Sequence, residues 1–208
     1  QAWRGQAWGK WRRIDRVLLD QYGKGRSATT GCPSGEVQTR LRLGQYDQAK
    51  QAASDLRDLF GAENFFCELM DHGLDIERRV QKDLLRLARE LGLPLVATND
   101  LHYTSPEDAK AHSALLCVQS GSTMMDPNRF KFDADDFYLK SPAEMRHTWR
   151  ELPEACDNTL LIAEMCDISF TVDEGRYMPQ FPCPPGENEA SWFVKEVQRG
   201  LHERFPAG

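Results

Sequence analysis

The sequence predicts an α/β fold in which short strands alternate with longer helices around a mainly parallel sheet. Two apolar stretches of strand length, "NFFCELM" (64–70) and "LPLVAT" (93–98), flank a helical pattern over 76–91. Strands that alternate with helices of ten or more residues are typical of βαβ units, in which the strands run parallel. The sheet is therefore expected to be either open or closed into a barrel.

The composition limits the classes of protein to which the chain can belong. Its 208 residues suffice for one large domain, or for one domain and the start of another. A hydrophobic share of 40% and a charged share of 28% exclude collagen-like, disordered and membrane classes. The net charge of -6 excludes a domain-wide basic field, so any contact with nucleic acid is expected to be local. Cysteines without a Cys-x-x-Cys pair indicate a reducing cytoplasm.

The amino-terminal third is expected to contain two helices. Apolar residues at helical spacing predict one helix within 10–26, ended by Gly23, and a turn-rich segment, "SATTGCPSGE" (27–36), follows it. A second helix is expected over 46–60, with Gly61 as its carboxyl-terminal cap. Small and apolar residues recur in this helix at spacings of three and four: Ala49, Ala52, Ala53, Leu56 and Phe60.

The strand at 64–70 and the helix over 76–91 come next, and Gly92 with Pro94 ends that helix. After the strand at 93–98, Ser105 and Pro106 form the amino-terminal cap of a helix that runs to about 119.

The remaining elements follow the same alternation. "FYLK" (137–140) is interpreted as a strand, and Ser141 with Glu144 forms a capping box that opens a helix. A long helix over 153–165 and a short strand, "CDISF" (166–170), complete the series.

Two features divide the chain into parts. The first nine residues (1–9), "QAWRGQAWG", repeat a short pattern and are expected not to be native sequence. Four prolines within "YMPQFPCPPG" predict a domain boundary at 179–186, after a domain over 10–178. The segment 187–208 then opens a second domain with an amphipathic helix. Its inward residues are expected to be Trp192, Val194 or Phe193, Val197 and Leu201.

Asp100 and His102 in "VATNDLHY" are the first candidate site residues. In an extended segment, positions two apart project to the same face, so both side chains could reach one cation. The carboxyl ends of parallel strands are where ligands collect in α/β folds. The alternative is that Asp100 closes a turn and His102 makes a hydrogen bond in the loop. Spacing alone favours this alternative, because a catalytic zinc ion needs about three protein ligands.

Cys32 is the second candidate, since Pro33 favours an extended backbone at Cys32 and the neighbouring glycines permit a sharp turn. A thiol in such a loop could bind metal or act as a nucleophile, although an unpaired cysteine is more often a small buried hydrophobic residue.

Three further polar residues end the strand at 64–70: Glu68, Asp71 and His72. They could orient metal ligands, but a turn at Asp71 and a solvent-facing His72 are the favoured interpretation. His112, His147 and His202 lie in helices without partners at metal spacing and are interpreted as structural or solvated.

Several motifs together resemble one family. They are "TTGCPSGEVQTRLRLGQYD", "ELMDHGLDIERRV", "LVATNDLHY", "DPNRFKFDADDFYLKS", "LPEACDNTLLIAE" and "MPQFP". This set is similar to the C-family replicative DNA polymerases, the alpha subunits of bacterial DNA polymerase III. The resemblance implies a partial, distorted β/α barrel of the polymerase-and-histidinol-phosphatase (PHP) type, followed by the first helix of a polymerase palm domain.

The resemblance also implies roles for residues. Cys32, Asp100 and His102 match metal ligands of the family's PHP site, which would hold zinc or manganese. Zinc suits a set that includes a thiolate. The other ligands of the cluster, and the palm aspartates that bind magnesium, are expected to lie outside this chain, which by itself should not polymerise DNA.

For the full-length protein the resemblance implies a cytoplasmic DNA-directed DNA polymerase, a nucleotidyltransferase. It would act on primer-template DNA and dNTPs with a sliding clamp and other replisome subunits, without a membrane. The PHP portion would contribute to a 3'-5' exonuclease for proofreading. Two alternatives are a metal-stabilised structural platform and a free-standing PHP phosphoesterase, and the palm-like tail disfavours the latter.

Overall fold

The computed structural model describes residues 15–169 and 180–206, and the chain divides into two compact units, Gln1–Cys166 and Asp167–Gly208. The nine residues that the sequence analysis sets apart lie outside the described residues, and so does part of the segment that leads to the proline-rich stretch. The domain boundary expected at 179–186 therefore stays a prediction.

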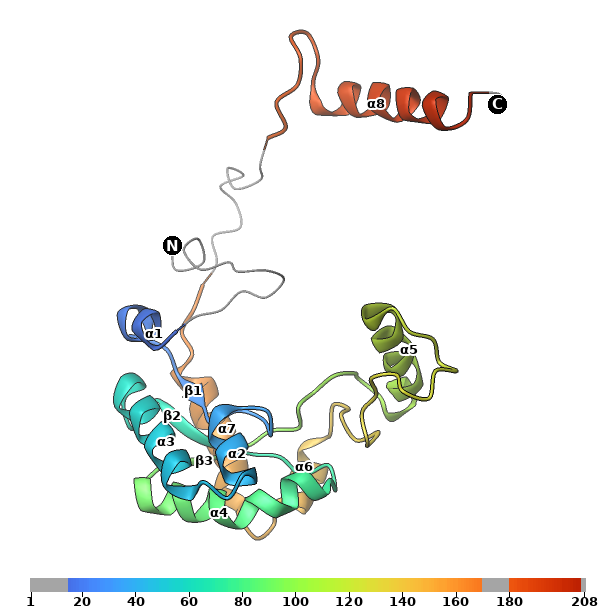
Figure 1. Cartoon of the computed structure of the whole chain (residues 1–208). Coiled ribbons are helices and arrows are strands. Elements are labelled where there is room, and N and C mark those ends of the chain that lie inside the picture. The colour runs from blue at the N-terminus through green and yellow to red at the C-terminus, as the bar shows by residue number, and fades with distance from the viewer. Residues whose placement is uncertain (1–14, 170–179, 207–208) are drawn as a thin grey trace. The chain divides into compact units, whose positions relative to one another are not determined.

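A three-stranded parallel sheet forms the centre of the first unit (Figure 1). Its strands are β1 (Ala28–Thr29), β2 (Phe65–Leu69) and β3 (Leu95–Ala97), in the order β1-β2-β3. Ala28 pairs with Phe65, and Cys67 pairs with Leu95. The α/β class and the parallel sheet are confirmed, and the arrangement is that of a partial β/α barrel.

Strand β2 is buried along its whole length. Side chains alternate between the two faces of a strand, so Phe65, Cys67 and Leu69 share the face that packs against the helices. Phe66 and Glu68 lie on the opposite face and are also buried. Burial on both faces is typical of the central strand of a parallel sheet and explains the continuous apolar run.

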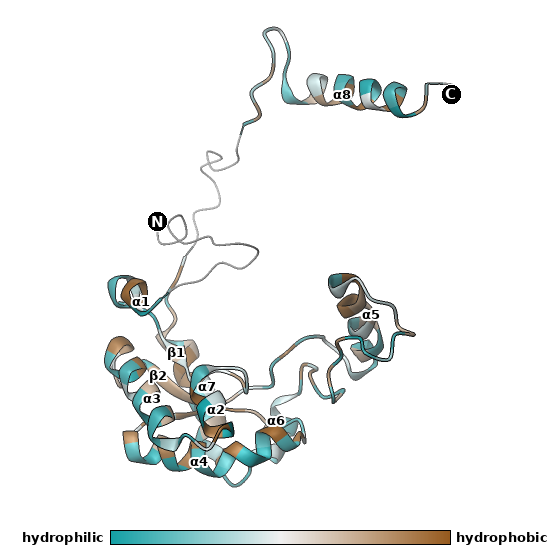
Figure 2. Ribbon diagram, in the orientation of Figure 1, coloured by the Kyte–Doolittle hydropathy of each residue, from teal (hydrophilic) through white to brown (hydrophobic). Residues whose placement is uncertain are grey.

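Three helices cover one face of the sheet: α2 (Glu36–Arg42), α3 (Tyr46–Phe60) and α4 (Asp75–Leu91). Small residues at Ala49, Ala52 and Ala53 are almost fully buried in α3, which allows the neighbouring helices to approach closely. Figure 2 shows apolar colour on the strands and polar colour on the outer surfaces of these helices. Both long helices were predicted, and each ends at a glycine with positive φ, Gly61 or Gly92.

The remaining helices of this unit follow the predicted caps. They are the 3-10 turn η2 (Pro106–Asp108), α5 (Ala109–Ser120), α6 (Pro142–Thr148) and α7 (Pro153–Met165). The predicted capping box joins Ser141 to Glu144, and the predicted cap residue Ser105 forms a second box with Asp108. On α7, the Asn158 amide donates to the carbonyl oxygen of Leu95 at 2.7 Å, which ties α7 to β3.

At the amino-terminal end, helix α1 (Arg16–Tyr22) confirms the described part of the helix expected within 10–26. Its first turn is capped by Asp15, which accepts a hydrogen bond from the backbone N–H of Leu18, and Gly23 follows its last residue.

Three expectations about local structure were wrong. The turn-rich segment 27–36 contains β1 and leads directly into α2. Strand β1 has two residues and no pattern of its own, and its pairing with β2 stabilises it. "FYLK" forms only an isolated bridge between Tyr103 and Tyr138. The described part of "CDISF", 166–169, is not a strand.

In the second unit, α8 (Glu189–Arg204) confirms the predicted helix and has no buried residue. No described residue covers its expected inward side chains, so their inward orientation stays a prediction. Phe193, Val194, Val197 and Leu201 are each more than half exposed.

Candidate functional site at the carboxyl ends of the strands

Polar side chains meet where the three parallel strands end. Glu68 on β2 accepts hydrogen bonds from the hydroxyls of Thr29 (2.5 Å) and Thr98 (2.6 Å), one to each carboxylate oxygen. Its backbone N–H donates to the hydroxyl of Thr30 at 3.0 Å. Each of the three strands thus supplies one part of a polar bridge across the sheet. The role expected for Glu68 in orienting metal ligands stays a prediction.

Cys32 follows β1 in a tight loop. Its carbonyl oxygen accepts from the N–H of Gly35 at 2.8 Å, and Gln38 donates to the carbonyl oxygen of Gly31 at 2.6 Å. Gly31 has φ +78°, a conformation that favours glycine. Cys32 is partly exposed, so it is not the small buried hydrophobic residue that an unpaired cysteine usually is.

Asp100 has φ +42° and is, among the described residues, the one non-glycine residue with positive φ. The segment is therefore not extended at this point, and the alternation argument that placed Asp100 and His102 on one face was wrong. A left-handed backbone costs about 1 kcal/mol for a residue with a side chain. Such strain persists where surrounding contacts enforce it and is common at functional sites.

The two side chains are nevertheless neighbours. The Nδ1 atom of His102 lies 3.9 Å from a carboxylate oxygen of Asp100 and 2.5 Å from its carbonyl oxygen. In the neutral imidazole, an Nδ1–H that donates to this carbonyl leaves the lone pair on Nε2. In this tautomer, Nε2 is the nitrogen that can bind a metal ion.

Aromatic rings surround His102 in this loop. Its ring centroid lies 5.2 Å from that of His112, 4.7 Å from that of Phe132 and 5.7 Å from that of Phe137. His112 was interpreted as structural or solvated, and its ring contacts with His102 and Phe132 agree with a structural role. Burial, and then the charge of His102, lower the pKa of His112 from its ordinary value. His147 and His202 are exposed, as expected.

His72 is buried, and the solvent-facing interpretation was wrong. Its Nδ1 lies 2.6 Å from Oε1 of Glu77, and its Nε2 lies 3.0 Å from the carbonyl oxygen of Asn99. Both partners are acceptors, so both ring nitrogens must carry hydrogen. Burial alone would lower the pKa of His72, but Glu77 and Asn99 together raise it above its ordinary value. This environment favours the charged form of His72, whose ring contacts the backbone carbonyl oxygen immediately before Asp100.

Asp71 forms the predicted turn, in which its carboxylate accepts from the backbone N–H of Gly73 at 3.0 Å.

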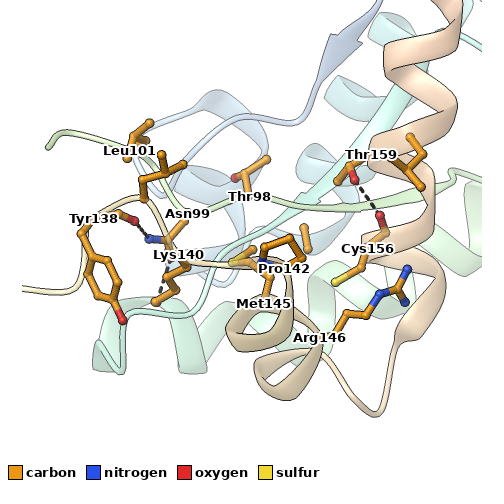
Figure 3. A pocket seen from close by; sticks show the side chains of 13 residues that line it. Thr98, Asn99, Leu101, Tyr138, Lys140, Pro142, Met145, Arg146, Cys156 and Thr159 are labelled. Carbon is orange, nitrogen blue, oxygen red and sulfur yellow. Dashed lines mark hydrogen bonds between the residues drawn. The ribbon is translucent and has the colours of Figure 1, made fainter. Parts of the chain in front are cut away.

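A mainly apolar pocket of about 390 Å³ lies beside these residues, between β3, α6 and α7 (Figure 3). Met145 and Leu160 contribute to its apolar lining, and Asn99 and Lys140 stand at its polar side. The sequence analysis did not find Asn99 or Lys140. Neither residue lies in a periodic pattern. The hydrogen bond between them joins segments far apart in the chain, which sequence patterns do not reveal.

The donor types of Cys32, Asp100 and His102 suit zinc, but the geometry brings only two of them together. The described residues contain no group of three or more His, Cys, Asp or Glu side chains placed to hold a metal ion. Cys32 follows β1 and Asp100 follows β3, so β2 separates them. Two inter-strand spacings amount to about 10 Å, so the loops that carry the two residues start well apart. The metal assignment stays a prediction.

Comparisons with known proteins find one matching family and several relatives. A family described as PHP domain matches residues 2–72, so the match takes in residues that the sequence analysis set apart. A DNA polymerase III subunit alpha of Mycobacterium tuberculosis is 56% identical over 96% of this chain. Those of Saccharopolyspora erythraea and Thermus aquaticus are 57% and 40% identical over 94% and 93% of it.

The chain spans 17% of the length of the first two relatives and 16% of the third. Among the described residues, no helix is both long and apolar enough to cross a membrane.

Proposed function

Over its matched length this chain belongs to the family of bacterial DNA polymerase III alpha subunits, and we propose that it forms part of the catalytic subunit of a replicative DNA polymerase. Identity of 56% over 96% of the chain is the observation that carries the proposal. The full-length protein would be a cytoplasmic nucleotidyltransferase that extends primer-template DNA with dNTPs, alongside a sliding clamp and other replisome subunits. Its magnesium ions would be bound by palm carboxylates outside this chain.

We further propose that the PHP portion contributes to a metal-dependent 3'-5' exonuclease that removes mispaired primer ends. Cys32, Asp100 and His102 would contribute metal ligands. The proximity of Asp100 and His102, with Nδ1 of His102 held by the Asp100 carbonyl, supports this role for the pair. Zinc is favoured over magnesium because thiolate is a soft ligand. A bound metal would supply a hydroxide at neutral pH.

The residues of this chain would act by orienting the ligands. Glu68 holds the ends of β1 and β3 through Thr29 and Thr98, which limits how far the loops that carry Cys32 and Asp100 can separate. His72 holds the carbonyl oxygen immediately before Asp100. Neither residue needs to contact DNA for the site to depend on it.

A structural platform is the second candidate for the PHP portion. The observation that favours it is that the described residues bring no three metal ligands together. In that case any bound metal would stabilise the domain without cutting DNA. A free-standing PHP phosphoesterase is disfavoured, because the relatives extend far beyond the matched segment.

Primer extension and mismatch excision by the full-length protein, measured with and without a chelator that removes zinc and manganese, separate these functions. Extension in the presence of magnesium supports the polymerase. Excision that is lost on chelation and restored by zinc or manganese supports the exonuclease. Absence of excision with unimpaired extension would favour the platform, and absence of extension would refute the polymerase.

A further inference from the structure

The segment 100–101 forms an arch whose two ends are held by the same short stretch of chain. Before the arch, the side-chain amide of Asn99 donates to the carbonyl oxygens of Asp136 (2.9 Å) and Tyr138 (2.7 Å). After the arch, the backbone N–H of His102 donates to the carbonyl oxygen of Phe137 at 2.9 Å. Three successive carbonyl groups therefore hold the arch at both ends, and the contact to Tyr138 is visible in Figure 3.

Both N–H donors and the oxygen of the Asn99 side chain make hydrogen bonds. Its two N–H donors reach the two carbonyl oxygens, and its oxygen accepts from Nζ of Lys140 at 2.9 Å. Lys140 is also paired with the carboxylate of Asp136. The backbone carbonyl oxygen of Asn99 accepts from the charged ring of His72. Asn99 thus joins the end of β3, His72 in the turn after β2, and the segment 136–140.

The strained residue lies immediately after this junction. Asp100 has φ +42°, a conformation that a residue with a side chain rarely adopts without support. Because Asn99 and His102 are both fixed to 136–138, the two residues between them must turn sharply. This turn directs the backbone of Asp100 so that its carbonyl oxygen reaches Nδ1 of His102.

We propose that Asn99 is a positioning residue that holds Asp100 in the left-handed conformation and so places the Asp100 carboxylate beside the His102 imidazole. The inference rests on the proposed function only in taking these two side chains as the functional pair. Asn99 itself need not contact a metal or DNA. His72 and Lys140 support it by fixing its backbone and its amide oxygen.

Hydrogen exchange of the full-length protein, followed by mass spectrometry, tests the proposal without a metal. Asn99→Ala removes both hydrogen bonds that the side chain donates and the one that it accepts from Lys140, so exchange should rise about 10-fold or more in peptides that cover 99–104 and 136–140. Peptides that cover β2 should not change. Asn99→Asp keeps the acceptor for Lys140 but loses both donors, so it should have the same effect and serves if the alanine variant folds poorly.

Asn158→Ala is the matched control, because Asn158 also donates to a carbonyl oxygen of β3 but at the other end of the strand. It should leave exchange over 99–104 unchanged. Unchanged exchange at the arch in both Asn99 variants would overturn the proposal. A uniform rise across β2 and β3 would do so too, because it would indicate a general loss of stability.

Zinc affinity, measured by competition with a chromophoric chelator, separates this inference from the proposed function. If the protein binds zinc, Asn99→Ala should weaken binding about 10- to 100-fold, as is usual for residues that orient metal ligands. Equal affinity in the variant would refute the positioning role. If wild-type protein binds no zinc, the metal proposal fails while the exchange result still decides the role of Asn99.

Discussion

His72 and Glu77 form a buried charged pair in which Nδ1 of the imidazole lies 2.6 Å from Oε1 of the carboxylate. The two side chains are 1% and 7% exposed. The other carboxylate oxygen accepts from the backbone N–H of His72 at 2.8 Å. The pair joins the turn after β2 to the first turn of α4, and through Asn99 it reaches the loop that carries Asp100.

Glu77→Gln should destabilise this part of the protein by about 2–3 kcal/mol, because it leaves a buried imidazole without its counter-charge. Hydrogen exchange of peptides that cover β2 in the full-length protein measures the effect. Asp157→Asn is the control, since it removes an exposed pair with Arg146 and should cost less than about 1 kcal/mol. Equal effects of the two substitutions would contradict the assignment of a buried ion pair.

The contribution of this pair to the stability of the folded protein should fall both at high pH and in acid. The pKa of His72 is raised above its ordinary value of 6.5, so its contribution is fully present below pH 6.5 and is lost as the pH rises through the folded pKa. Burial would raise the pKa of Glu77, but hydrogen bonds from His72 lower it below 4.5. Its contribution is therefore present above pH 4.5 and is lost in acid.

The difference in exchange between wild type and Glu77→Gln, compared at equal pH, should be largest between pH 4.5 and 6.5 and smaller at pH 9. A difference that grows towards pH 9 would contradict a raised pKa of His72 in the folded protein.

Thr98→Val should cost about 1–3 kcal/mol, because it leaves one oxygen of the buried Glu68 carboxylate without its donor. Thr159→Val is a control with the same change of side chain. The hydroxyl of Thr159 donates to the carbonyl oxygen of Cys156 within its own helix, so its loss should cost less. The cost of each substitution is measured from hydrogen exchange of peptides that cover β2 and β3. An equal cost at Thr98 and Thr159 would contradict the hydrogen-bonded bridge that Glu68 forms across the sheet.

The chain of residues 1–208 alone should fold poorly. In the described residues, β1 and β3 are the outer strands of a three-stranded sheet, and unpaired strand edges favour association over folding. We expect a broad thermal transition by circular dichroism. A sharp, reversible and concentration-independent transition would contradict this expectation.

The sequence predicted those elements whose signals are local. The alanines of α3, the period of α4 and the capping box at Ser141 are readable within a few residues, and all are confirmed. Strand β1 has two residues and no pattern, and only its pairing with β2 defines it. The N-cap residue of α2 is Gly35, which has no side chain to cap the helix, so the amino terminus of α2 has no signal in the sequence.

The candidate site was predictable in its residues but not in its geometry. Asp100 and His102 are close because distant carbonyl groups at 136–138 force a left-handed turn, which no local rule predicts. The burial of His72 depends on a carboxylate in the next helix and a carbonyl oxygen at the end of another strand. A histidine that precedes an acid in the first turn of a helix is the one signal that could have indicated this pair.

The most direct test of the proposed exonuclease is mismatch excision relative to primer extension in the full-length Asp100→Asn protein, with the exposed Asp20→Asn as control. Asparagine keeps the size and the tolerance for a left-handed backbone but removes the negative charge. We predict that excision is lost, extension remains measurable, and the control behaves as wild type. Undiminished excision in Asp100→Asn would contradict the proofreading role.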